Sequence, residues 1–298
     1  MRDLVSESSL DPVHSRCIFC GSLNLSGVRS IVQKVPLVAL RVCLDCRAQS
    51  VNRLPARGYL DSLYSAEEYA GHLESSKRLT RALGGRLAAE FLAVSPCPTT
   101  LRILDYGGGS GALGLAVAEK LADRDLDSRV TVVDLSNEGV LEGVKFFTPE
   151  SFDRDSENFD VILCSAVVEH LRDPGIRLQA LFERLNVRGW MYVRSPQLAG
   201  LARLRPSWYR WPRHLSDFGP QFWSRFPTLA GWEVDTVWSR ACRPETEWRS
   251  RPLPTAASTL LKSPCSAEQA VRRVLRLSRS CRYPFVGGWE FLGRKHGA

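Results

Sequence analysis

Long hydrophobic runs are missing from this sequence of 298 residues. No stretch approaches the roughly 18 apolar residues that cross a bilayer, and the first residues lack the apolar segment of a signal peptide. Internal repeats and low-complexity tracts are also missing. These absences argue against a membrane-spanning, secreted or repeat protein, so we expect a globular, cytoplasmic chain without a membrane span.

Lysine is scarce relative to arginine, although the chain is basic overall, with a formal net charge of +8. Its hydrophobic content of 44% is ordinary for a globular protein and is enough for one large domain or two modest ones. A basic surface suits either a phosphate-bearing small substrate or a polyanion such as RNA. The charge therefore leaves both classes of partner open, and the oligomeric state is left open as well.

The nine cysteines are an odd number, which argues against a fully paired extracellular framework. Four of them form two C-x2-C pairs, Cys17 with Cys20 and Cys43 with Cys46, separated by residues 21–42. This spacing lets four thiolates converge on one Zn²⁺ and fills every coordination position, so the metal is expected to be structural. We predict a zinc-ribbon module over residues 1–56; a redox dithiol or a set of ordinary reduced cysteines is the alternative.

An apolar strand over residues 101–105 ends in Asp105 and leads into a turn that is rich in glycine. Gly107, Gly109 and Gly111 suit a tight turn whose bare backbone a ligand can approach closely. Residues 112–121 then have the composition of a helix. The pattern predicts a nucleotide-cofactor turn, but the glycine spacing by itself is a weak signal.

Two further strands end in polar residues that such a cofactor could use. Residues 130–134 form a β-branched run ending in Asp134, whose carboxylate is placed to accept both hydroxyls of a ribose. Residues 159–165 form a buried strand ending in Ser165. Asp105 stands where a dinucleotide-binding turn would have its first glycine, so an NAD enzyme is the less favoured alternative.

These segments, together covering roughly residues 101–196, resemble the class I S-adenosylmethionine-dependent methyltransferases. The resemblance implies an α/β fold with a Rossmann-like, seven-stranded sheet and S-adenosylmethionine as the cofactor. It assigns Asp105 and the three glycines to the methionine end of the cofactor and Asp134 to its ribose. The remaining predicted cofactor neighbours are Leu135, Ser165 and Tyr69, and Tyr69 is expected to close over the cofactor.

The rest of the chain is divided around this core. We expect a helical linker over residues 57–100, with one helix capped by Ser65 and a second over 77–93. The methyltransferase domain is expected over 101–298, with cap insertions near 198–218 and 240–284. Core strands are predicted near 101–105, 130–134, 143–147, 159–164, 190–194, 232–238 and 285–293, and helices near 111–122, 136–141, 175–187, 220–229 and 268–278.

Two histidines are candidates for the base that removes a proton from the methyl acceptor. His170 follows Glu169 after the strand that ends at Ser165. Related RNA and quinone-precursor O-methyltransferases bind a divalent metal here through a Glu-x-x-Glu-His motif, but Ala166 stands at the first glutamate, which argues against that metal. Capping a helix or shaping the pocket floor is the alternative role for Glu169 and His170.

His214 lies in the first cap insertion, in the sequence Trp-Pro-Arg-His. Here the chain resembles zinc-ribbon methyltransferases that act on nucleotide-linked deoxysugars and other glycan precursors, in which a histidine helps to deprotonate the sugar. The tyrosine and glutamate that precede this histidine in those enzymes are replaced by Trp211 and Arg213. A packing or capping role for His214 is the alternative.

The leading hypothesis is a methyltransferase for a small-molecule acceptor, such as a sugar or another biosynthetic precursor. Arg203, Arg205 or Arg213 is available for a phosphate on that acceptor. An RNA methyltransferase is the alternative, because interleaved arginine and aromatic residues can hold a splayed-out base. A non-catalytic protein that uses the ribbon to bind a partner is a third, weaker hypothesis.

Overall fold

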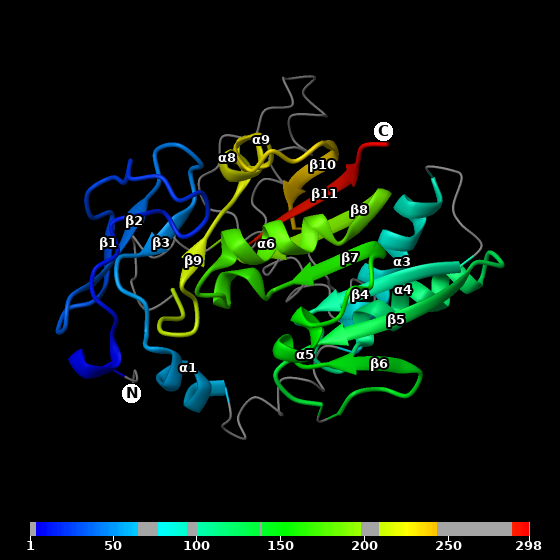
Figure 1. Ribbon diagram of the computed structural model, residues 1–298, viewed down its shortest axis with the longest axis horizontal. Coiled ribbons are helices and arrows are strands. Elements are labelled where there is room, and N and C mark those ends of the chain that lie inside the picture. Colours follow the sequence, from blue (N-terminus) through cyan, green and yellow to red (C-terminus); the bar gives the residue numbers. More distant parts are fainter. Residues whose placement is uncertain are drawn as a thin grey trace, which may run out of the picture.

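The computed structural model describes residues 4–64, 77–93, 100–137, 139–197, 209–242 and 288–297 (Figure 1). These residues form a seven-stranded sheet and a four-stranded sheet. In this described part of the chain, every helix is too short or too polar to cross a membrane. Cys97, Cys265, Cys281, Tyr69, Arg203, Arg205 and most of the second predicted cap insertion lie outside the described residues.

The larger sheet is the α/β sheet that the sequence predicts. Its strands are β4 (Thr100–Tyr106), β5 (Asp127–Val133), β6 (Val144–Phe147), β7 (Phe159–Ser165), β8 (Leu185–Ser195), β10 (Val234–Ala241) and β11 (Trp289–Lys295). They lie in the order β10-β11-β8-β7-β4-β5-β6. The five strands from β8 to β6 pair in parallel, and β11 is antiparallel to both of its neighbours. The central strands β4 and β7 are buried along most of their length because helices cover both faces of the sheet.

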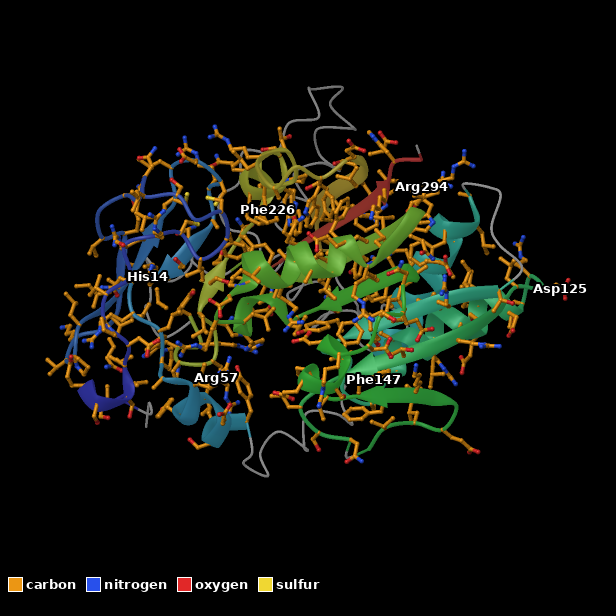
Figure 2. The ribbon with its side chains drawn as sticks, in the orientation of Figure 1. His14, Arg57, Asp125, Phe147, Phe226 and Arg294 are labelled. Carbon is orange, nitrogen blue, oxygen red and sulfur yellow. The ribbon has the colours of Figure 1, made fainter. Side chains whose placement is uncertain are left out.

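Two layers of helix cover this sheet. On one face, α3 (Lys77–Leu92) and α4 (Ala112–Ala122) bury Leu87 and Phe91 against β4 and β5. On the other face lie α6 (Pro174–Glu183), α8 (Pro220–Trp223) and α9 (Phe226–Leu229), with the short α5 (Pro149–Asp153) near the edge strand β6. The carboxyl ends of the parallel strands point toward the N-terminal sheet in Figure 1. Asp125 marks the opposite end, far from His14 and Arg57 (Figure 2).

The smaller sheet contains the predicted ribbon and one strand that the sequence did not assign to it. Its strands β1 (Ser30–Gln33), β2 (Val38–Val42) and β3 (Gln49–Val51) are joined by β9 (Ser216–Asp217), which pairs antiparallel with β3. Leu215 and Tyr209 are fully buried in the hydrophobic core of this sheet. The end of the first cap insertion is therefore built into the ribbon.

Several predicted elements differ from the structure. The described residues of 136–141 are not helical; Gly139 within this segment and Gly143 just after it have φ angles of +71° and +82°. The helix expected over 175–187 ends at Glu183, because the chain already enters β8 at Leu185. The helix expected near 220–229 is interrupted, giving α8 and α9, and Pro227 stands in the first turn of α9.

The first helix after the ribbon is one that the sequence did not predict. Helix α1 runs over Arg57–Tyr64, ahead of the predicted cap at Ser65, and buries Leu60 in the ribbon core. The helix predicted to begin at Ser65 and the one near 268–278 lie outside the described residues.

Candidate active site and metal centre

The glycine turn after β4 has the backbone conformation that the sequence predicts. Gly107, Gly109 and Gly111 have φ angles of +68°, +54° and +79°, all in the left-handed region that favours glycine. Gly107 donates its N–H to the carbonyl of Val133, and Gly111 precedes the first residue of α4. A Cβ on Gly107 would overlap the side chain of Val167. The turn is therefore pressed closely between β5 and the loop after β7.

The side chain of Asp105 is buried beneath this turn. It is fully buried, and its Oδ2 accepts the N–H of Gly114 in α4 at 2.9 Å. Burial is the main cause that raises the pKa of its carboxyl to about 7. Asp105 holds the turn to the start of α4, and its predicted contact with the methionine end of the cofactor stays a prediction.

Asp134 joins the glycine turn to the end of β5. Its two carboxylate oxygens accept the N–H groups of Gly109 and Leu135, each at 2.7 Å. Burial raises its pKa, and these two hydrogen bonds oppose that rise. An ionised carboxylate can accept about four hydrogen bonds, so capacity for the two hydroxyls of a ribose remains. The side chain of Leu135 beside it is 59% exposed.

Ser165 ends β7 at the same edge of the sheet and is partly exposed. Strand β7 lies next to β4, with Asp105 paired to Leu163, so Ser165 is close to the glycine turn. Ala166 follows with a φ of +58°, a left-handed conformation that turns the chain away from the sheet. The predicted cofactor residues within the described part of the chain thus gather at one edge.

The structure brings the two candidate histidines together with Glu169. Glu169 and His170 lie in the short helix η3 (Val168–His170), and His214 comes from the turn before β9. The ring centroids of His170 and His214 are 4.8 Å apart, and His170 Nε2 is 3.8 Å from Glu169 Oε1. One side-chain donor atom from each of the three residues lies within 4.8 Å of the others. We call these three residues the acid–histidine cluster.

A backbone carbonyl orients the ring of His170. His170 Nδ1 lies 2.9 Å from the carbonyl oxygen of Arg213 and 3.0 Å from the hydroxyl of Tyr64. Because a carbonyl only accepts, Nδ1 carries the hydrogen, and the lone pair is left on Nε2, on the side of Glu169. Sequence reasoning missed this contact of Tyr64, since Tyr64 and His170 are 106 positions apart and no local pattern links them.

Burial keeps the acid–histidine cluster uncharged near neutral pH. It lowers the pKa of His170 to about 4 and that of His214 to about 3. It raises the pKa of Glu169 to about 8, and neither oxygen of Glu169 has a partner at full hydrogen-bond geometry among the described residues. The three residues can accept and pass on a proton. Their lone pairs are also close enough together to bind one cation, but a lone pair that binds a cation cannot accept a proton at the same time.

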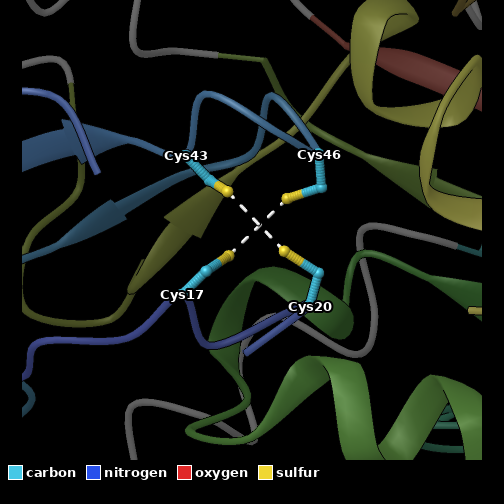
Figure 3. Close-up of side chains that lie close together, drawn as sticks. All are labelled: Cys17, Cys20, Cys43 and Cys46. Atoms are coloured by element: carbon cyan, nitrogen blue, oxygen red, sulfur yellow. Dashed lines mark hydrogen bonds between the residues drawn. The ribbon is translucent and has the colours of Figure 1, made fainter. Parts of the chain in front are cut away.

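The four cysteines of the two C-x2-C pairs converge at the tip of the ribbon (Figure 3). Their sulfur atoms lie within 4.8 Å of one another, with Cys17–Cys46 and Cys20–Cys43 both at 3.6 Å. These distances are far longer than the roughly 2.05 Å of a disulfide. Tetrahedral Zn²⁺ with bonds of about 2.3 Å would place the sulfurs about 3.8 Å apart, so the four cysteines fit a zinc ion. Arg47, with a φ of +67°, takes the glycine-like position after the second pair.

Comparison with known proteins agrees with this architecture. A methyltransferase-domain family matches residues 77–237, more than half of the chain. The ubiquinone biosynthesis O-methyltransferase of Cereibacter sphaeroides (strain ATCC 17025 / ATH 2.4.3) is 32% identical over 158 residues, which cover 48% of this chain and 62% of that protein. The enzyme of the same name from Azorhizobium caulinodans is 34% identical over 147 residues, covering 45% of this chain and 56% of that protein.

The match therefore spans about three fifths of the length of these curated relatives. Among solved structures, the plantazolicin methyltransferase BpumL in complex with SAH has a TM-score of 0.51 at 17% identity, covering 79% of this chain and 93% of that one. This likeness concerns the fold alone. On the family match, which runs from α3 into β10 and includes the glycine turn and the acid–histidine cluster, the chain belongs to the methyltransferase-domain family.

Proposed function

We propose that this chain is an S-adenosylmethionine-dependent methyltransferase that acts on a small-molecule acceptor. The observation that carries the proposal is the meeting of two sets of residues at one edge of the sheet. The glycine turn and Asp134 form one set, and the acid–histidine cluster forms the other. Val167, which touches the turn, is only two residues from Glu169, so the two sets are directly connected.

The cofactor would supply a methyl group on a positively charged sulfur, which is already activated toward displacement. The backbone of Gly107–Gly111 would hold its methionine end, and Asp134 would accept hydrogen bonds from its ribose. Leu135 offers an exposed apolar side chain beside Asp134, and Ser165 a hydroxyl at the same edge. The protein's main task is then to align the acceptor with the methyl group.

The acid–histidine cluster would take the proton of the acceptor. As a hydroxyl oxygen of the acceptor bonds to the methyl carbon, the methyl–sulfur bond would break and leave a neutral thioether. The O–H bond would break as well, and its proton would pass to the Nε2 lone pair of His170 or to His214. The carbonyl of Arg213 holds His170 in the tautomer that accepts at Nε2. Such general base catalysis contributes about 10²–10⁴ in rate. The catalytic roles of Glu169, His170 and His214 belong to this proposal.

An oxygen acceptor on a small biosynthetic precursor is the preferred substrate class. The relatives are named O-methyltransferases of ubiquinone biosynthesis, which supports a small molecule with a hydroxyl group. A phosphorylated sugar or another anionic precursor also remains in the proposal, because Arg210 and Arg213 lie close enough to His170 to lower its pKa by their charge. Arg203 and Arg205 keep their proposed role as further phosphate ligands.

RNA is the second candidate acceptor, and the net charge of +8 is what favours it. The ribbon packs one side of its metal-binding tip against α6, α8 and α9, so this surface is not open to a nucleic acid. That packing favours the small-molecule proposal. RNA binding would weaken steeply with added salt, and binding of a small acceptor less so.

We further propose that Cys17, Cys20, Cys43 and Cys46 hold a structural Zn²⁺. Four thiolates leave no open coordination position for catalysis. The proposed domain division keeps a ribbon over 1–56, a linker over 57–100 that covers the cofactor with Tyr69, and a methyltransferase domain from 101 onward. One change is needed, because residues 209–217 are built into the ribbon sheet and its core.

The proposal is tested by transfer of labelled methyl groups from S-adenosylmethionine into an extract that is then separated into RNA and small metabolites. We expect label in the metabolite fraction, lost with Asp134→Ala and with His214→Ala. Asp127→Ala, an exposed change at the start of the strand that leads to Asp134, is the matched control. Label in RNA would favour the second candidate, and label that persists in both variants would contradict the proposed site.

A further inference from the structure

The segment that carries Glu169 and His170 is held at four successive places by residues of the N-terminal part of the chain, in one case through Leu215. Leu215 donates its N–H to the carbonyl of Glu169 at 2.8 Å, while its own carbonyl accepts the N–H of Val51 in β3 at 3.0 Å. The hydroxyl of Tyr64 lies against His170 Nδ1. The other two contacts are Arg172 with Asp11 and the carbonyl of Pro55, and the N–H of Gly175 with the carbonyl of Ile18.

The last of these contacts reaches the metal centre directly. Ile18 and Phe19 lie between the ligands Cys17 and Cys20, so their backbone forms the first knuckle of the ribbon. Gly175, in the first turn of α6, touches this backbone so closely that a Cβ on it would overlap the carbonyl group of Phe19. The ring of Phe19 packs on Phe222 with centroids 4.8 Å apart. The first knuckle thus packs against α6, the helix that follows the loop carrying Glu169 and His170.

The glycine turn is not held in this way. Gly107 bonds to Val133, Gly109 to Asp134 and Gly111 to Gly108, so all three partners belong to the seven-stranded sheet and its loops. Among the described residues, no hydrogen bond joins this turn to residues 4–56. The hydrogen bonds of the glycine turn therefore come from the seven-stranded sheet, although Val167 of the loop that carries Glu169 and His170 packs against the turn.

We propose that the four-cysteine metal centre positions the acid–histidine cluster, so that metal occupancy sets the orientation of the His170 ring without changing the cofactor site. This inference rests on the proposed function. With the metal bound, the first knuckle keeps its shape and fixes the start of α6, and Tyr64 and Arg172 hold the loop between. Without it, the backbone of Ile18 and Phe19 is released, and the carbonyl of Arg213 and the ring of His170 lose their alignment. Gly175 is in this sense a positioning residue.

The test compares the tautomer of His170 in four samples of the full chain by NMR of ¹⁵N-labelled histidine. The samples are the zinc-loaded protein, the same protein after removal of zinc by a chelator, and zinc-loaded Gly175→Ala and Gly27→Ala. Gly175→Ala pushes the knuckle away without touching a cysteine, and Gly27→Ala is the control because a Cβ there meets open space. A His170→Gln spectrum identifies the signals of His170. Binding of SAH is measured on every sample by calorimetry.

We expect the Nδ1-protonated tautomer of His170 in the zinc-loaded protein and in Gly27→Ala. It should be lost after zinc removal and in Gly175→Ala, and it should return when zinc is added back. The affinity for SAH should stay within about twofold throughout, because the hydrogen bonds of the glycine turn come from the seven-stranded sheet and its loops and not from residues 4–56. With an acceptor in hand, methyl transfer should fall by about 100-fold in the two altered samples, the scale of a 1 Å misplacement.

An unchanged His170 tautomer in zinc-free protein or in folded Gly175→Ala would overturn the inference. If one of these two samples unfolds, the other decides. Unfolding of both would also overturn it, because the metal centre would then support the whole fold and not the loop alone. Absence of SAH binding in the zinc-loaded wild-type chain would overturn the proposed function instead, which separates the two failures.

Discussion

Gly107 combines a left-handed backbone with a neighbour that leaves no room for a side chain. We expect Gly107→Ala to weaken SAH binding by at least about tenfold, because the new Cβ meets Val167 and a left-handed alanine costs about 1–2 kcal/mol. Calorimetric titration with SAH measures the effect. Gly143→Ala is the matched control, since Gly143 has a φ of +82° but faces open space. Equal losses in both variants would assign the effect to backbone strain alone.

Asp134 needs both of its oxygens as acceptors. In Asp134→Asn, one of the N–H groups of Gly109 and Leu135 would face an amide that donates. Leaving a buried donor unpaired costs about 1–3 kcal/mol, so we expect the affinity for SAH to fall by roughly 5- to 150-fold. Asp127→Asn, at the exposed start of β5, should bind SAH as the wild type does. Normal binding by Asp134→Asn would show that Asp134 does not organise the cofactor site.

The raised pKa of Glu169 predicts how the free energy of unfolding depends on pH. Its pKa is raised from 4.5 to about 8 by burial, so between these values the folded chain holds a proton that the unfolded chain releases. Glu169 should therefore lower the free energy of unfolding as pH rises through this window, by up to about 1.4 kcal/mol per unit, and Glu169→Gln should remove that contribution to the slope. Urea unfolding at pH 6 and pH 8 measures it.

The control for this change is Glu119→Gln, an exposed glutamate on α4 that should keep the slope. His170 and His214 act in the opposite direction, because their pKa values are lowered from 6.5 to about 4 and about 3. Their contribution to stability is complete above pH 6.5 and is lost as pH falls below it. A Glu169→Gln chain whose free energy of unfolding changes between pH 6 and pH 8 by the same amount as that of the wild type would contradict the buried, protonated state of Glu169.

At the scale of elements, the ribbon tip and the helices α8 and α9 form one packed unit. Phe19 is 6% exposed and touches the rings of Phe218, Phe222 and Phe226. We expect Phe19→Ala to lower the free energy of unfolding by about 3–5 kcal/mol, measured in urea, because a large buried ring is removed. Leu23→Ala, on the exposed side of the ribbon, should change it by no more than about 0.5 kcal/mol.

A loss of less than about 1 kcal/mol in Phe19→Ala would show that this contact is not part of the stable core. Arg225 makes a second contact between this segment and the ribbon tip. Its Nη1 donates a hydrogen bond of 3.1 Å to the carbonyl of Asp45, which lies in the second knuckle, between Cys43 and Cys46. Both knuckles thus rest on the segment between β9 and β10. A sequence pattern shows each aromatic residue but not which distant element it will meet.

Elements with strong local signals were predicted well, and those with weak signals were not. The strands near 101–105, 130–134 and 159–164 have apolar or β-branched runs and match β4, β5 and β7. Residues 136–141 failed as a helix, since a short segment beside two glycines gains too few hydrogen bonds to offset the cost of nucleation. Strand β9 has two residues, so only its pairing with β3 defines it.

For the whole molecule, one hydrophobic cluster runs from the four-cysteine tip of the ribbon into the seven-stranded sheet. It contains Cys17, Phe19 and Cys46 together with residues of β7 and β8. We therefore expect the zinc-loaded chain to unfold in a single calorimetric transition, and removal of zinc by a chelator to lower the midpoint temperature, since metal binding stabilises only the folded site. Adding zinc back should restore it.

Metal analysis should find one zinc ion per chain, and the content should fall in a Cys20→Ser, Cys43→Ser double variant. Cys164→Ser, a buried cysteine outside the ribbon, is the control and should keep its zinc. Two separate transitions, with the second unaffected by the chelator, would indicate that the ribbon folds as an independent module. That outcome would contradict the shared core.

The sequence by itself determined the alternation of strands and helices, the glycine turn with Asp134, and the pairs of cysteines, because each depends on neighbours within a few residues. It also named Glu169, His170 and His214 separately. Only the tertiary structure decided that these three meet, that Tyr64 and Arg213 orient His170, and that residues 209–217 complete the ribbon. Contacts between residues that far apart depend on how whole elements pack, and no local pattern of residues encodes that packing.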